Sequence, residues 1–102
     1  MKIRPFNLGK LVATPACLDV VPMERIAECI HRHAAGDWGV CCKDDWRAND
    51  LATLDGSRIF SVYWIDELNH DKGKWWCITE AEGYHEDGVY RQSTCCLLPE
   101  NY

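Results

Sequence analysis

The second half of the chain holds three apolar segments with the composition of β-strands. They cover residues 59–65, residues 75–79, and a segment from Val89 or Arg91 to Leu98. Ile, Val, Phe, Tyr and Trp dominate them, and these residues are enriched in strands. Polar, glycine-containing connections at 69–73 and 83–88 separate the segments. This pattern predicts a three-stranded antiparallel meander, which ends at Pro99.

The first half carries helical patterns instead. Three helices are predicted, from Pro15 to Val20, from Pro22 to about Ala34, and from about Lys43 to Leu54. Gly36 and Gly56 follow the second and third helices, where glycine is the preferred stop. We expect Trp38, which lies between these helices in the chain, to fill the core between them. Residues 8–13 are short and apolar, and we expect them to cover an edge of the sheet.

These elements define an α+β fold. Two or three helices would pack on one face of a three- to four-stranded antiparallel sheet. With 102 residues, the chain has the size of a single domain that spans residues 1–102.

Charge and cysteine content limit the function. Lys and Arg number 11, Asp and Glu number 16, and the net charge is -5, which disfavours binding to nucleic acid or to an anionic membrane. Proline and glycine interrupt any apolar run near the start, and no stretch approaches the roughly 20 apolar residues of a membrane span. The seven cysteines are an odd number, so we expect reduced thiols in a cytoplasmic protein. We expect Cys77, Cys95 and Cys96 to act as small buried hydrophobes.

The aromatic residues give the strongest sign of a binding surface. Trp75 and Trp76 are neighbours in one strand and must point to opposite faces of the sheet. Both faces of the sheet therefore carry large aromatic side chains, although a sheet with helices on one side needs only one apolar face. We predict an exposed aromatic patch that binds a protein, with acidic residues at its rim that favour a basic partner. The predicted partner-binding residues are Tyr63, Trp64, Asp66, Glu67, Trp75, Trp76, Glu86 and Asp87.

Metal and catalytic sites are weaker alternatives. Cys29 and His33 are four residues apart on one predicted helix and are the best metal candidates, but they lack the Cys-x-x-Cys spacing of a zinc site. Without a metal, His33 would face solvent. A nucleophilic cysteine beside a histidine has no supporting motif, and the adjacent carboxylates are typical of solvated loops and helix starts. We therefore predict no cofactor.

Six short motifs run through nearly the whole chain: LGKLVATP (8–15), GDWG (36–39), NDLA (49–52), GSRIFSVY (56–63), ITEA (78–81) and TCCLLPENY (94–102). Together they resemble a family of small bacterial proteins carried on plasmids, phages and integrated elements. The chain departs from the family pattern at Ala16, where glycine is expected, at Cys41, near which an acidic residue is expected, and in a longer connection at 82–88. The family pattern does not require the cysteines. The resemblance implies a mobile-element context and no particular reaction.

We therefore expect a non-enzymatic protein-binding domain. The mobile-element context suggests an inhibitor of a host defence nuclease, of the anti-CRISPR or anti-restriction type. A homodimer that uses the same surface is one alternative, and a zinc-stabilised module or a small thiol or carboxylate enzyme is another.

Overall fold

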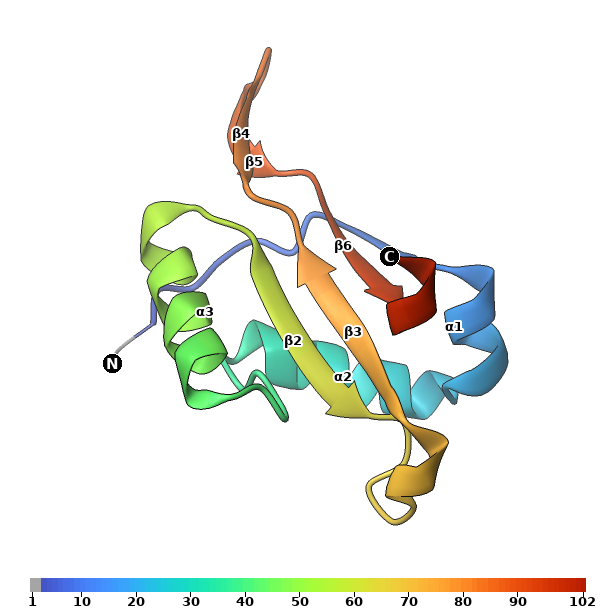
Figure 1. The fold of residues 1–102 in the computed structure, drawn as a ribbon. Coiled ribbons are helices and arrows are strands. Elements are labelled where there is room, and N and C mark those ends of the chain that lie inside the picture. The colour runs from blue at the N-terminus through green and yellow to red at the C-terminus, as the bar shows by residue number, and fades with distance from the viewer. Residues whose placement is uncertain (1–2) are drawn as a thin grey trace.

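The computed structural model describes residues 3–102 and shows three α-helices, a four-stranded sheet and a separate two-stranded sheet (Figure 1). The α+β fold class is confirmed. In chain order the elements are β1 (Lys10–Ala13), α1 (Pro15–Val20), α2 (Met23–Ala34), α3 (Lys43–Asp55), β2 (Ile59–Trp64), the 3-10 helix η1 (His70–Lys72), β3 (Lys74–Thr79), β4 (Glu82–His85), β5 (Gly88–Arg91), β6 (Ser93–Leu97) and the 3-10 helix η2 (Pro99–Asn101).

The larger sheet has the strand order β1-β6-β3-β2. The antiparallel meander β2-β3-β6 is confirmed, and β1 covers the edge of β6 as expected. However, β1 pairs with β6 in parallel, so the sheet is mixed rather than wholly antiparallel. A long connection through the helices separates β1 from the meander, and such a connection does not impose the antiparallel direction that a hairpin does.

The helices begin and end where the sequence predicts. The Cys17 N–H donates a hydrogen bond to the Thr14 side chain, and Pro15 is the first residue of α1, as expected for an N-cap followed by proline. Gly56 ends α3 in the left-handed conformation, with φ of 84°.

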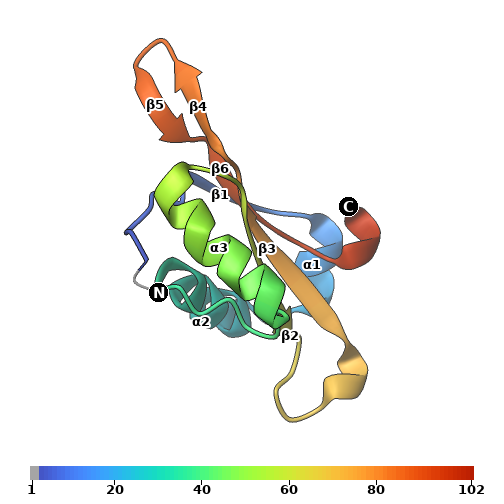
Figure 2. The ribbon, with the colours of Figure 1, turned by 60° about the vertical axis from the view of Figure 1, so that its left-hand side comes forward.

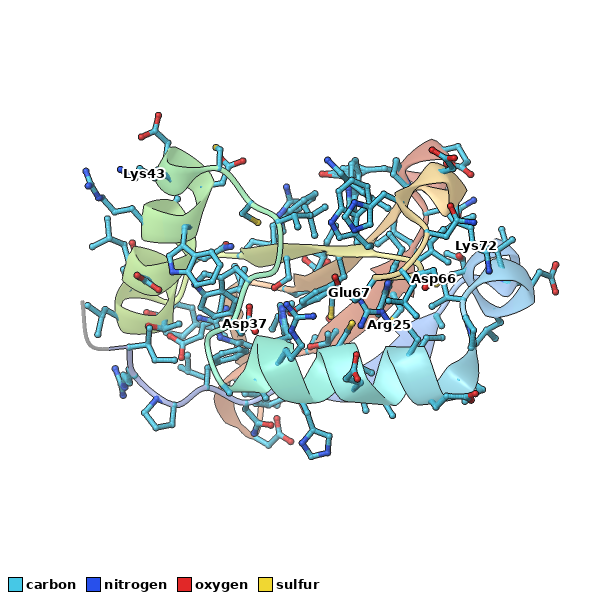
Figure 3. The ribbon with its side chains drawn as sticks, turned by 90° about the horizontal axis from the view of Figure 1, so that it is seen from below. Arg25, Asp37, Lys43, Asp66, Glu67 and Lys72 are labelled. Atoms are coloured by element: carbon cyan, nitrogen blue, oxygen red, sulfur yellow. The ribbon has the colours of Figure 1, made fainter. Side chains whose placement is uncertain are left out.

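One face of the larger sheet packs against α1 and α2, which also contribute to the main core. In Figure 3, α2 lies on one side of β2. The buried residues of this core are Cys17, Val21, Ile26, Cys29, Tyr63, Ile65, Trp75, Cys77, Cys96 and Leu98.

A second, smaller core joins α3 to the edge of the sheet. Trp38 is fully buried there with Ala52 and Ile59, and its indole N–H donates a hydrogen bond of 2.9 Å to Asp50 of α3. Its ring also meets His33 of α2 edge-on, at 5.6 Å between centroids. The prediction that Trp38 fills the core between two helices is confirmed.

The connection predicted at 83–88 is a β-hairpin, which we call the arm (residues 82–91). Its two strands, β4 and β5, pair with each other as a sheet of their own and project away from the rest of the molecule (Figures 1 and 2). The strand predicted up to Leu98 is therefore two strands, separated at Gln92. His85 pairs with Gly88, so Glu86 and Asp87 form the turn. The Asp87-Gly88 pair marks a turn in the sequence, but the four-residue strands beside it carry no clear strand signal.

Candidate functional site

The candidate site is the face of the larger sheet that points away from α1 and α2. We call it the outer face and define it by Phe60, Val62, Trp64, Trp76 and Tyr102. Along β2, residues 59, 61 and 63 are buried toward the helices, whereas 60, 62 and 64 are half-buried on the opposite side, because successive side chains of a strand alternate between faces. In Figure 1 the outer face is turned toward the viewer, and α2 lies behind β2 and β3.

Three aromatic rings form a row across the outer face. The Phe60 and Trp76 rings lie 4.7 Å apart between centroids, and Trp76 meets Tyr102 at 5.6 Å. Arg58 closes the row, since its guanidinium donates a hydrogen bond of 2.7 Å to the Tyr102 hydroxyl. The row combines apolar rings with polar groups at its end, as protein-binding surfaces do.

Trp64 forms a second aromatic position at the other end of β2. It stacks on His70 at 3.9 Å, and the Lys74 amine lies 4.9 Å from the centre of its ring. Both neighbours belong to the segment that links β2 to β3 and begins β3, so this connection fixes the orientation of Trp64.

The structure divides the predicted aromatic anchors into two groups. Trp64 and Trp76 lie on the outer face, half-buried. Tyr63 and Trp75 instead lie in the main core, almost without exposure, and the Tyr63 hydroxyl donates a hydrogen bond of 2.7 Å to the Asp37 carbonyl. The assignment of Tyr63 and Trp75 to a partner surface is therefore wrong, because their alternation places them toward the helices.

The four predicted rim carboxylates do not form one rim. Asp66 and Glu67 lie in the connection after β2, whereas Glu86 and Asp87 lie at the tip of the arm, at the opposite end of the molecule (Figure 1). The extended shape of the molecule, which measures 41 Å along its longest axis, keeps the two pairs apart.

Asp66 and Glu67 are also neutralised within the protein. One Glu67 oxygen lies 2.8 Å from Arg25 (Figure 3) and 3.2 Å from Arg32, and the hydrogen bond from Arg25 lowers the pKa of Glu67. Asp66 lies 3.3 Å from the Lys72 amine. Glu67 therefore holds the connection against α2, whereas Asp66 pairs within the connection itself. Both carboxylates offer little free charge to a partner.

The same ion pairs border a cleft of about 460 Å³. Val20, Pro22 and Ile65 contribute its apolar surface. Its two cations are used within the protein, since Lys72 is paired with Asp66 and Arg25 binds Glu67 and the Trp64 carbonyl, the latter at 2.9 and 3.1 Å. The cleft therefore has a suitable size for a small ligand but no unpaired cation on its walls to orient one.

His33, expected to face solvent unless it bound metal, is fully buried. Its Nδ1 is hydrogen-bonded to the Ser61 hydroxyl, and its Nε2 lies 2.8 Å from the Thr79 hydroxyl. Burial is the main cause that lowers its pKa to about 4. Cys29 is also buried, so the two metal candidates do not present free ligand atoms together. Within residues 3–102, no group of three or more His, Cys, Asp or Glu side chains is arranged to hold a metal ion.

All seven cysteines are free thiols. Cys77 and Cys96 are buried, which confirms their predicted role as small hydrophobes, whereas Cys95 is half-buried. Burial raises the pKa of Cys17 and of Cys29 to about 11. Because the thiolate is the nucleophile, these thiols are poorly suited to covalent catalysis.

Sequence reasoning missed part of the outer face. Phe60 and Val62 lie four and two residues before Trp64 in β2 and therefore on the same face of the strand, so the prediction for Trp64 should have included them. Tyr102 had no signal, because it belongs to the C-terminal turn after η2 rather than to a strand.

The fold and the outer face define an α+β protein whose sheet carries helices on one side and an open aromatic surface on the other. Comparison with protein-family models, curated proteins and solved structures finds no match. In the part of the chain that the structure describes, no helix is both long and apolar enough to cross a membrane.

Proposed function

We propose that this chain is a non-catalytic protein-binding domain whose partner docks on the outer face. The observation that carries the proposal is the row Phe60–Trp76–Tyr102, in which Phe60 and Trp76 are half-buried and Tyr102 is exposed, on a sheet whose opposite face already supplies the core. Contiguous exposed apolar surface with a polar border is typical of interaction sites, and Trp and Tyr are the side chains that most often dominate binding energy.

The resemblance to mobile-element proteins extends the proposal to the kind of partner. On this basis the domain acts in the bacterial cytoplasm as an inhibitor of a host defence nuclease. The acidic balance of the chain, with a net charge of -5, supports a basic partner, since a surface that binds nucleic acid is built to receive negative charge.

The test is affinity capture from bacterial lysate with the tagged full chain, read by native mass spectrometry. We expect one stoichiometric complex with a nuclease or another defence protein. Trp76→Ala should abolish the complex, because it removes the central ring of the row. Val62→Lys should also abolish the complex by placing a charge on the same face. The methylene groups of the lysine side chain can cover the surface that Val62 covers, so the fold should stay intact.

The matched control is Leu51→Lys, at an exposed apolar position of α3 away from the sheet. It should leave the complex unchanged. A complex that survives both Trp76→Ala and Val62→Lys would show that the partner does not use the outer face. A homodimer that these two variants disrupt, without any foreign protein, would assign the face to self-association instead.

A further inference from the structure

The arm is firmly rooted in the body of the protein. Arg91, at the end of β5, is buried, and its guanidinium donates hydrogen bonds to the carbonyls of Ser57, Glu80 and Ala52 at 2.7, 3.0 and 2.9 Å. The Glu82 N–H adds a hydrogen bond of 2.8 Å to the Gly56 carbonyl. The arm is therefore held in a fixed direction at its base, although an isolated two-stranded hairpin is only marginally stable.

Beyond this base, the arm exposes aromatic and aliphatic side chains. Tyr84 is 92% exposed, and Val89 and Tyr90 are 54% and 37% exposed. His85 stacks on Tyr90 at 4.1 Å, which stiffens the outer part of the hairpin. No other residue within 3–102 covers this apolar surface.

Negative charge accompanies these aromatic rings. Glu86 and Asp87 form the turn of the hairpin and make no ion pair with another described residue. The carboxylate of Asp87 raises the pKa of the Tyr90 phenol. The one cation of the arm, Arg91, points its charge into the body. The tip thus combines free carboxylates with accessible aromatic faces.

From these features we infer that the arm is a second binding surface, for an arginine- and lysine-rich groove of the partner protein. A guanidinium or ammonium group is attracted both by a carboxylate and by the face of an aromatic ring, and the arm offers both on a support that projects far enough to enter a groove. The inference rests on the proposed function, because the basic groove belongs to the same partner protein. It adds a second contact with that partner, one that is distinct from the outer face and is made through carboxylates and aromatic rings.

The test uses decaarginine as the cationic probe and the full chain labelled with ¹⁵N. At about 20 mM salt, where charges interact over a long range, we expect the peptide to shift the amide signals of residues 82–91. Glu86→Lys combined with Asp87→Lys should weaken binding at least ten-fold, and Tyr84→Ala about three-fold, in line with one exposed cation–π contact. Binding should largely disappear at about 0.5 M salt, where the remaining charges are screened.

The matched control reverses a second adjacent carboxylate pair, Asp44 and Asp45, which are exposed in the first turn of α3. Asp44→Lys combined with Asp45→Lys makes the same change in net charge and should alter the affinity less than two-fold. Equal weakening by the two double variants, or peptide-induced shifts centred on α2 or α3, would overturn the inference. Neither result would affect the proposed function, which the Trp76 and Val62 variants test on the outer face.

Discussion

The Nε2 atom of His33 lies 2.8 Å from the Thr79 hydroxyl in the centre of the fold. Thr79 lies 2.7 Å from the Thr94 hydroxyl, which donates a hydrogen bond of 2.7 Å to the Leu8 carbonyl. A carbonyl only accepts, so Thr94 accepts from Thr79, and Thr79 accepts from His33. The Nε2 atom of His33 therefore carries a proton. Because burial lowers its pKa to about 4, His33 is neutral at pH 7, and its Nδ1 then accepts from the Ser61 hydroxyl. This chain of hydrogen bonds connects α2 with three strands and with the segment before β1.

The neutral state of His33 makes the fold sensitive to acid. Burial lowers the pKa of His33 from 6.5 to about 4. Between these two pH values, His33 is mostly protonated in the unfolded chain and mostly neutral in the folded protein. Its contribution to stability is therefore complete above pH 6.5 and is lost progressively as the pH falls toward 4. We expect the free energy of unfolding to fall by about 2 kcal/mol between pH 7 and 5, as measured by urea titration.

Two substitutions separate this effect from other titrations. His33→Gln should be less stable at pH 7 and should lose most of the decline between pH 7 and 5, because the titrating group is gone. His31→Gln, at an exposed position on the same helix, should keep the full decline. An unchanged decline in His33→Gln would contradict the assignment to His33.

Trp38 is the side chain on which the smaller core depends. Trp38→Ala removes a fully buried indole and leaves Asp50 without its 2.9 Å donor. We expect a loss of about 3–5 kcal/mol in the free energy of unfolding, the usual cost of deleting a large aromatic from a core. Trp46→Ala, at a half-buried position beside the same core, should cost clearly less. A loss below about 1 kcal/mol for Trp38→Ala would contradict the burial of this ring.

Gly39 is required by a close approach of two backbones. Its φ is 75°, and a Cβ atom there would lie 1.9 Å from the Val62 carbonyl oxygen, where residues 38–40 pair with β2. Gly39→Ala must break this pairing, and we expect a loss above about 3 kcal/mol, measured by thermal or urea unfolding. Gly73→Ala is the matched control. Its φ of 92° would strain an alanine in the same way, but an added Cβ atom at Gly73 would meet no other atom within 4 Å. It should cost only about 1–2 kcal/mol.

The sequence predicted the helices and the meander because local signals agree with the fold there. The Thr14-Pro15 start, the glycine stops and the period-2 aromatic strands each act within a few residues. The parallel direction of β1 lacks such a signal, since it depends on the path of the chain through α1 and α2. The arm was missed for a different reason: its strands have only four residues each, and their pairing buries no apolar face.

The candidate site was only half predictable for a related reason. Alternation required Trp75 and Trp76 to face opposite ways, but it could not decide which one faces the helices. That choice depends on the register of β3 with β2, in which Trp75 lies opposite Tyr63 and Trp76 opposite Val62. Glu67 was assigned to a charged rim because sequence alone does not show that Arg25 and Arg32 meet it across 42 and 35 residues.

The seven thiols should differ sharply in reactivity, and this difference tests the core directly. Cys42 is exposed and should react rapidly with an aromatic disulfide reagent at pH 8. Cys17 and Cys29 are buried, and burial raises their pKa to about 11, so the native protein holds almost no thiolate at these positions. They should react only as fast as the protein opens, and Cys42→Ser should remove the rapid phase. Rapid labelling of Cys29, located by peptide mass mapping, would show that α2 does not cover this thiol and would return it to consideration as a nucleophile.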